Sequence, residues 1–205
     1  MDPLSLGRFL RSCSVAFHSV REYHLADIII KRAIRQWPDN SNLEDVLTKV
    51  VLLNSLYHTN VLDVWKIAQH ICSKNIDSKI EKGDLTVVDD IRLGHGIRTK
   101  KERNLYSFAA KYVNWHRPTE FPIYDNLVAR LLTDLNRKYA FHQPFTRSGL
   151  RNFQVLKSVL DGLASWARLE DMRYKRIDEA LWVYAKQRYD KLPDGISTKV
   201  GLPVT

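Results

Sequence analysis

The chain has 205 residues, of which 44% are hydrophobic and 27% charged, a composition that is typical of a folded protein and excludes intrinsic disorder. Lys and Arg number 32 against 23 Asp and Glu, so the net charge is +9, as expected of a protein that binds a polyanion such as nucleic acid; a charge that only keeps the protein soluble is the alternative. The two cysteines lack the ligand spacing of zinc or iron–sulfur sites, so we expect no metal and no cofactor.

The N-terminal residues Met1–Asp2–Pro3 lack the basic and apolar regions of a signal peptide, and no run approaches the roughly 20 apolar residues of a membrane span. We therefore expect a protein that is not secreted and not in a membrane, located in the cytoplasm (with the nucleoid) or in the nucleus. Two isolated thiols, Cys13 and Cys72, fit a reducing compartment.

Apolar residues recur with helical spacing along nearly the whole chain, and no strand-like alternation extends beyond a few residues. Residues 74–90 are polar and irregular, with at most short helical turns. The Thr99–Glu102 segment reads as a capping box that opens a helix ending before Pro118. The pattern predicts an all-α domain over residues 1–190, followed by an extended tail over 191–205. Helices are expected near residues 9–20, 28–34, 41–60, 62–72, 99–117, 127–135, 150–166 and 177–189.

The segment Phe121–Val128 is the most informative part of the sequence. A short apolar run with a proline ends in Asp125 at the start of a helix. Aspartate is a preferred N-cap, and this role alone would explain the residue. The same amide donors and the helix dipole also favour the ionised carboxylate, which could stabilise a positively charged sugar in a transition state.

The stretch Glu120–Leu132 resembles the F-P-[IV]-x-D-x-x-V-x-R-x-L segment of helix-hairpin-helix DNA glycosylases, most closely the adenine-specific branch. Residues 47–55, 105–113 and 177–182 resemble further helices of that superfamily, in family order, so the resemblance covers roughly residues 42–190. It implies a divergent member with a two-lobed, all-α helix-hairpin-helix fold, in which Asp125 is the catalytic carboxylate. It also implies double-stranded DNA with a flipped base as the partner, and we expect a monomer.

The family hairpin normally reads L-P-G-[VI]-G, whereas this chain has Leu93–Ile97 without a proline and farther from Asp125. The glycines could expose amides to a DNA phosphate, or form a plain turn. The basic residues around them suit contact with a DNA backbone, although a solvated basic face is the alternative. The predicted DNA-binding residues are Gly94, Gly96, Arg98, Lys100, Lys101 and Arg103.

Bifunctional members of the superfamily use a nucleophilic lysine, and Lys111, between Ala110 and Tyr112, is the candidate in the most apolar setting. A lysine at a helix surface is the alternative, and we favour a monofunctional enzyme in which Asp125 positions water. The adenine-specific branch also uses a glutamate in the early helix, where this chain has Lys49, so excision of adenine is not expected.

A flipped base requires a wedge that replaces it and a pocket that receives it. Asn54, for which a helix C-cap is the alternative, stands at the family's wedge position, and several aromatic and polar residues could line the pocket. Trp166 and Trp182 are expected in the core. The remaining wedge or pocket candidates are Tyr57, His58, Trp115, His116 and Tyr124.

The sequence thus predicts a DNA glycosylase that hydrolyses the N-glycosidic bond of a damaged or modified base. Two other hypotheses stay open: a module of the same fold that binds modified or bent DNA without catalysis, and an unrelated helical protein with an acidic partner.

Overall fold

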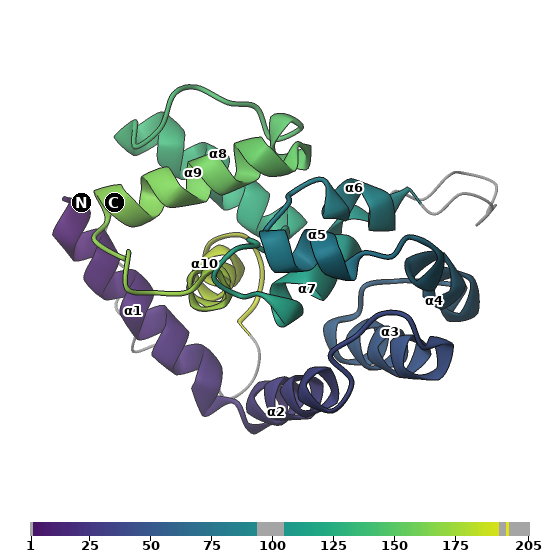
Figure 1. The fold of residues 1–205 in the computed structure, drawn as a ribbon. Helices are drawn as coiled ribbons and strands as arrows, with labels where there is room; N and C mark the ends of the chain where they lie inside the picture. Colours follow the sequence, from purple (N-terminus) through teal and green to yellow (C-terminus); the bar gives the residue numbers. More distant parts are fainter. Residues whose placement is uncertain (1, 94–104, 193–195, 197–205) are drawn as a thin grey trace. The chain divides into compact units, whose positions relative to one another are not determined.

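The computed structural model describes residues 2–93, 105–192 and 196, and every regular element in these ranges is helical (Figure 1). The expectation of an all-α protein is thereby confirmed. The helices, in chain order, are α1 (Pro3–Ser19), α2 (Arg21–Gln36), α3 (Leu43–Tyr57), α4 (Val64–Ser73), α5 (Asp77–Lys82), α6 (Val87–Arg92), α7 (Tyr106–His116), α8 (Asn126–Tyr139), the 3-10 helix η1 (Gly149–Arg151), α9 (Phe153–Trp166) and α10 (Tyr174–Tyr189).

The chain forms two compact units: unit 1 comprises residues 1–25 and 124–205, and unit 2 comprises residues 26–123. In unit 1, α1 packs along α10, α10 also contacts α8, and α9 packs on η1 (Figure 1). The approach of α1 to the chain after α9 is close, because a Cβ atom at Gly7 would lie 2.1 Å from the backbone oxygen of Ala167. The core of unit 1 is built from apolar side chains of these helices, among them Leu6, Leu10, Leu131, Leu163, Ala180 and Leu181.

In unit 2, α3 packs against α4 and α7, while α6 packs against α7 and α4. The fully buried side chains at these contacts include Val46, Val50, Leu53, Ile67, Ile71, Ile91 and Phe108. Helices α5 and α6 occupy the segment that was expected to be irregular, and each has six residues. The sequence expectation of at most short helical turns at this point agrees with the structure.

Most expected helices are present, with shifted ends. Helix α1 begins at Pro3, six residues before the expected start, because Asp2 caps it by accepting from Ser5 N. Helix α3 lies within its expected range of 41–60, spanning Leu43–Tyr57, and is capped by Asn42. Helix α7 is described only from Tyr106, so the expected capping box at 99–102 lies outside the described residues.

The two tryptophans expected in the core are each only half-buried, which corrects that expectation. The Trp166 ring lies 5.3 Å from the Tyr139 ring, and the Trp182 ring lies 5.7 Å from that of Tyr23. Because these rings are large, they cover their aromatic neighbours while part of each stays in contact with solvent. Among the helices of the described ranges, none has both the length and the apolar character that crossing a membrane requires.

Candidate functional site

Asp125 is the N-cap residue of α8, at the end of a buried stretch of chain. Tyr124 is 3% exposed, whereas Asp125 itself is half-buried. One carboxylate oxygen, Oδ1, accepts from the backbone N–H groups of Leu127 at 2.8 Å and Val128 at 3.2 Å. The other oxygen, Oδ2, accepts no hydrogen bond from any residue that the structure describes. The carboxylate is thus anchored through one oxygen and presents the second.

The residue after Asp125 is held from two sides. The Tyr124 hydroxyl donates to Oδ1 of Asn126 at 2.9 Å, and Arg147 donates through Nη2 to the Asn126 backbone oxygen at 3.0 Å. These contacts fix the first turn of α8 and bring the cationic guanidinium of an exposed side chain to the residue next to Asp125. An anionic ligand that approaches Asp125 would therefore find a positive charge beside the carboxylate.

Lys111, the candidate nucleophile, lies in the middle of α7 in unit 2 and is buried. Its Nζ donates to Oγ of Ser107, one turn earlier, at 2.8 Å. The amine is therefore engaged in a hydrogen bond within its own helix. Asp125 belongs to unit 1, so the two predicted catalytic residues come from different units.

The wedge candidate Asn54 is tied into the turn that follows α3. Its Nδ2 donates to the Val61 oxygen at 2.9 Å, while Oδ1 accepts from Thr59 Oγ1 at 3.0 Å and from Val61 N at 2.9 Å. The helix C-cap is instead His58, which is exposed and has a left-handed φ of 47°. The amide of Asn54 thus stabilises the turn in the structure.

The aromatic candidates of unit 2 lie near one another. The Tyr57 and Trp115 rings are 6.2 Å apart in an edge-to-face arrangement, and Tyr57 donates its hydroxyl to Asp27 Oδ1 at 2.6 Å. His116 is the last residue of α7, with its ring 5.3 Å from that of Tyr112. The structure therefore brings Tyr57 and Trp115 together, while Tyr124 belongs to unit 1 with Asp125.

Lys49, which the sequence resemblance aligned with a glutamate of the adenine-specific glycosylases, is 1% exposed. Its Nζ donates to the backbone oxygens of Trp37 at 3.0 Å and Asp39 at 2.7 Å and to Asn40 Oδ1 at 2.8 Å. Burial lowers the pKa of Lys49 to about 8, against the opposing influence of nearby carboxylates such as Asp77. The lysine holds the turn before α3 and has no free donor for a substrate.

The six predicted DNA-binding residues lie outside the described residues: Gly94, Gly96, Arg98, Lys100, Lys101 and Arg103. Arg92, which precedes them, donates from Nε to Asp89 Oδ1 at 2.5 Å, and its guanidinium lies 5.5 Å from the centre of the Tyr106 ring.

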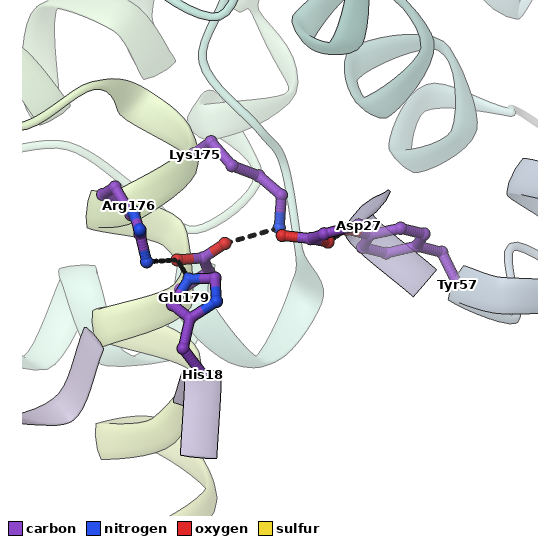
Figure 2. A network of polar contacts seen from close by, with 6 residues as sticks. All are labelled: His18, Asp27, Tyr57, Lys175, Arg176 and Glu179. Atoms are coloured by element: carbon purple, nitrogen blue, oxygen red, sulfur yellow. Dashed lines mark hydrogen bonds and ion pairs between the residues drawn. The ribbon is translucent and has the colours of Figure 1, made fainter. Parts of the chain in front are cut away.

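Sequence analysis missed a buried ion cluster in unit 1. Glu179 of α10 is 1% exposed, and its carboxylate contacts His18 Nε2 at 2.7 Å, Lys175 Nζ at 2.8 Å and Arg176 Nη1 at 3.4 Å (Figure 2). A metal cation there would compete with these positive groups, so we assign no metal to the cluster. The spacing of Lys175 and Arg176 to Glu179 was a helix-face signal for part of it, but nothing local pointed to His18, which is 161 positions away.

Comparison with known proteins gives the following matches. Residues 10–120 match the family HI_0787_N, described as an N-terminal domain. An uncharacterized protein of Haemophilus influenzae is 32% identical over 154 residues, which cover 75% of this chain and 72% of that protein. No solved structure matches the chain.

Proposed function

This chain belongs to the HI_0787_N family, and we propose that it is a DNA glycosylase with a two-lobed fold of the helix-hairpin-helix type. The protein binds double-stranded DNA as a monomer, everts one damaged or modified nucleotide, and hydrolyses the bond between the base and its deoxyribose. Asp125 supplies the catalytic carboxylate.

The observation that carries the proposal is the difference in hydrogen bonding between the two carboxylate oxygens of Asp125. Two backbone amides hold Oδ1, while Oδ2 has no partner among the described residues. A carboxylate that served only as a cap would need the amide contacts alone. Asp125 is half-buried at the positive end of α8, and its Oδ2 could face a cation that develops on the sugar.

The proposed reaction breaks the C1′–N bond, and the base leaves with the bonding electron pair and takes up a proton. Water adds to C1′ and releases a proton to Asp125 or to solvent. In between, the sugar has the positive charge of an oxocarbenium ion, which the Asp125 carboxylate stabilises electrostatically. The DNA supplies the anionic phosphates, for which Arg147 offers a charge beside the site.

We propose a monofunctional enzyme. A Schiff base at Lys111 would require its Nζ to reach C1′ of the sugar, whereas Nζ belongs to a buried side chain in the middle of α7 and donates to Oγ of Ser107. We therefore expect release of the base with an intact abasic site, and no product that borohydride traps.

The test replaces Asp125 with Asn, which preserves the N-cap because Asn and Asp cap helices about equally well. We expect the rate of base release to fall at least about 100-fold, as on loss of one electrostatic contact to a transition state, with DNA affinity retained. Base release is measured by mass spectrometry on DNA with oxidised, alkylated, deaminated and hypermodified bases.

Asp63→Asn is the matched control, since Asp63 caps α4 by accepting from Lys66 N at 3.0 Å and lies in unit 2. This variant should release base at the wild-type rate. If Asp125→Asn were as active as the Asp63 variant on a substrate that the wild type cleaves, Asp125 would not be the catalytic residue.

A DNA-binding module without catalysis is a second candidate. It is favoured by the engagement of Lys49 and Asn54, two positions that act on the base in the resembled superfamily, in the turns of unit 2. In that case the wild type and Asp125→Asn would bind modified DNA equally, and neither would release a base from any substrate of the panel.

A further inference from the structure

A hollow of about 680 Å³ lies in unit 1 beside the C-terminal half of α8. One side of it is the helix face with Thr133, Asn136 and Arg137, and the other side is the chain over residues 140–145. Its volume is of the size of a small-molecule site. The hollow is separate from Asp125, which lies at the opposite end of α8.

The wall of the hollow is held in place before any ligand binds. Ala140 ends α8 with a left-handed φ of 49°, and the chain turns back over the helix. Asn136 clamps this turn, because its Oδ1 accepts from His142 N at 2.9 Å and its Nδ2 donates to the Gln143 oxygen at 3.3 Å. The turn is therefore preorganised, which lowers the entropic cost of binding.

Helix α9 anchors the same wall from outside. His142 Nε2 lies 2.9 Å from Ser158 Oγ. One helical turn later, Gly162 allows the close approach, since a Cβ there would lie 3.2 Å from the Phe141 oxygen and 3.3 Å from His142 Cδ2. Two positions on one face of α9 thus support residues 141 and 142.

The lining combines a flat apolar surface with positive charge. Phe145 is half-buried, and its ring meets the His142 ring edge-to-face at 5.9 Å. Arg137 lies at the rim, and its side chain is 77% exposed. It forms an ion pair with Asp134, with 3.3 Å between Nη1 and Oδ1. Residues 130–151 contain a single acidic side chain, that of Asp134. The same segment contains five exposed basic side chains, which are Arg130, Arg137, Lys138, Arg147 and Arg151.

We propose that this hollow binds an unpaired nucleotide of a DNA strand, with the base against Phe145 and the phosphate at Arg137. A planar apolar group joined to an anion matches both features of the lining, and aromatic stacking with a neighbouring cation is how proteins hold single strands. An acidic protein segment could pair with the positive charge of Arg137, but it would offer no planar group to stack on the Phe145 ring.

The inference rests on the proposed function only for the path of the DNA. Asp125 and Asn136 are eleven positions apart on α8, which corresponds to about 16 Å at the helical rise of 1.5 Å per residue. A stacked strand advances about 3.4 Å per nucleotide, so the hollow would receive a nucleotide roughly five steps from the target, in DNA whose strand is unpaired at that position.

The test measures binding of a fluorescein-labelled, single-stranded 15-mer and of a blunt duplex of the same sequence by fluorescence anisotropy. Phe145→Ala should weaken binding of the single strand by at least about fivefold, since stacking contributes about 1–3 kcal/mol per base. Phe145→Trp should restore it. The duplex, whose internal bases expose no free face, should bind equally well to Phe145→Ala and the wild type.

Arg137→Ala should also weaken the single-strand complex and reduce its salt slope by about one. Arg8→Ala, which removes an exposed charge of α1, is the control and should change the affinity less than twofold. Circular dichroism verifies the fold, and Phe145→Leu replaces Phe145→Ala if the latter unfolds.

Unchanged single-strand affinity in folded Phe145 and Arg137 variants would overturn the proposal, as would equal losses for single strand and duplex or a wild type that binds no single strand. The proposed function is tested separately, by measuring base release by the wild type and by Asp125→Asn. Loss of that activity leaves the binding test intact, and failure of the binding test leaves base release intact.

Discussion

Lys49 is a buried and His116 a half-buried basic residue of unit 2, and the nitrogens of the two side chains differ in their hydrogen bonds. Lys49 donates to three oxygen acceptors and so stays satisfied. Nε2 of His116 is sealed from solvent and has no hydrogen-bond partner among the described residues. Burial, with a smaller contribution from the charge of Lys49, lowers the pKa of His116 from 6.5 to about 3. The imidazole is therefore neutral in the folded protein at neutral pH.

This lowered pKa predicts acid sensitivity. Between pH 6.5 and about 3 the unfolded chain binds a proton at His116 that the folded chain does not, so the stability contribution is complete above pH 6.5 and is lost as the pH falls toward 3. At pH 4.5 the loss from this residue should be about 3 kcal/mol. Urea unfolding of the wild type and of His116→Gln at pH 7.5 and 4.5 measures it.

The comparison between the two proteins isolates His116 from other titrating groups. His116→Gln should lose less stability than the wild type between the two pH values, whatever its stability at pH 7.5. Identical losses in the two proteins would show that His116 titrates normally in the folded state and that its Nε2 is accessible to water.

The contact between helix α1 and the chain after α9 depends on the absence of a side chain at Gly7. A Cβ atom there would meet the backbone oxygen of Ala167 at 2.1 Å, and a backbone atom cannot rotate away. Gly7→Ala should therefore destabilise the protein by roughly 1–3 kcal/mol, even though alanine favours helices by about 1 kcal/mol over glycine.

Thermal unfolding of Gly7→Ala and of Ser12→Ala, an exposed substitution on the same helix, tests this expectation. The Ser12 variant should differ from the wild type by at most about 0.5 kcal/mol. A Gly7 variant that is as stable as the wild type would mean that α1 shifts freely along its neighbours.

Local sequence signals were sufficient to predict those helices that have an N-cap residue and a stripe of apolar residues. Helix α8, with the Asp125 cap and buried Val128, Leu131 and Leu135, is the best example, and the cap was predicted correctly. Helices α5 and α6 lack side-chain caps, and burial of Ile80, Val87 and Ile91 stabilises them instead. Burial against the rest of the unit has no local signature beyond apolar residues, so the segment looked irregular.

In the candidate site, too, some features follow from local sequence signals and others depend on the tertiary fold. The capping geometry of Asp125 follows from residue type and position, and it was predictable. The partners of Lys49 are two backbone oxygens and an asparagine of a preceding turn, and Glu179 meets His18 from the other end of the chain. Such pairings are set by the tertiary fold, so sequence patterns predicted neither cluster.

The positive charge of the protein is shared by both units. Unit 1 carries seventeen Lys and Arg against eleven Asp and Glu, and unit 2 carries fifteen against twelve. Neither unit is acidic, so neither repels a DNA phosphate backbone. The surplus of unit 2 depends on residues 92–103, which hold five of its basic side chains and one glutamate.

A shared surplus predicts DNA binding that depends steeply on salt. Each phosphate neutralised by Lys or Arg releases counterions, so the logarithm of the affinity falls by about 0.9 per phosphate for each tenfold rise in salt. With about six phosphates contacted, the affinity for a 20-base-pair duplex should fall about 1,000-fold between 50 and 200 mM NaCl. Replacement of Lys100 and Lys101 by Gln should lower the slope by about two if both contact phosphates. A slope near zero in the wild type would instead mean that the charge of +9 serves solubility and that the polyanion is not DNA.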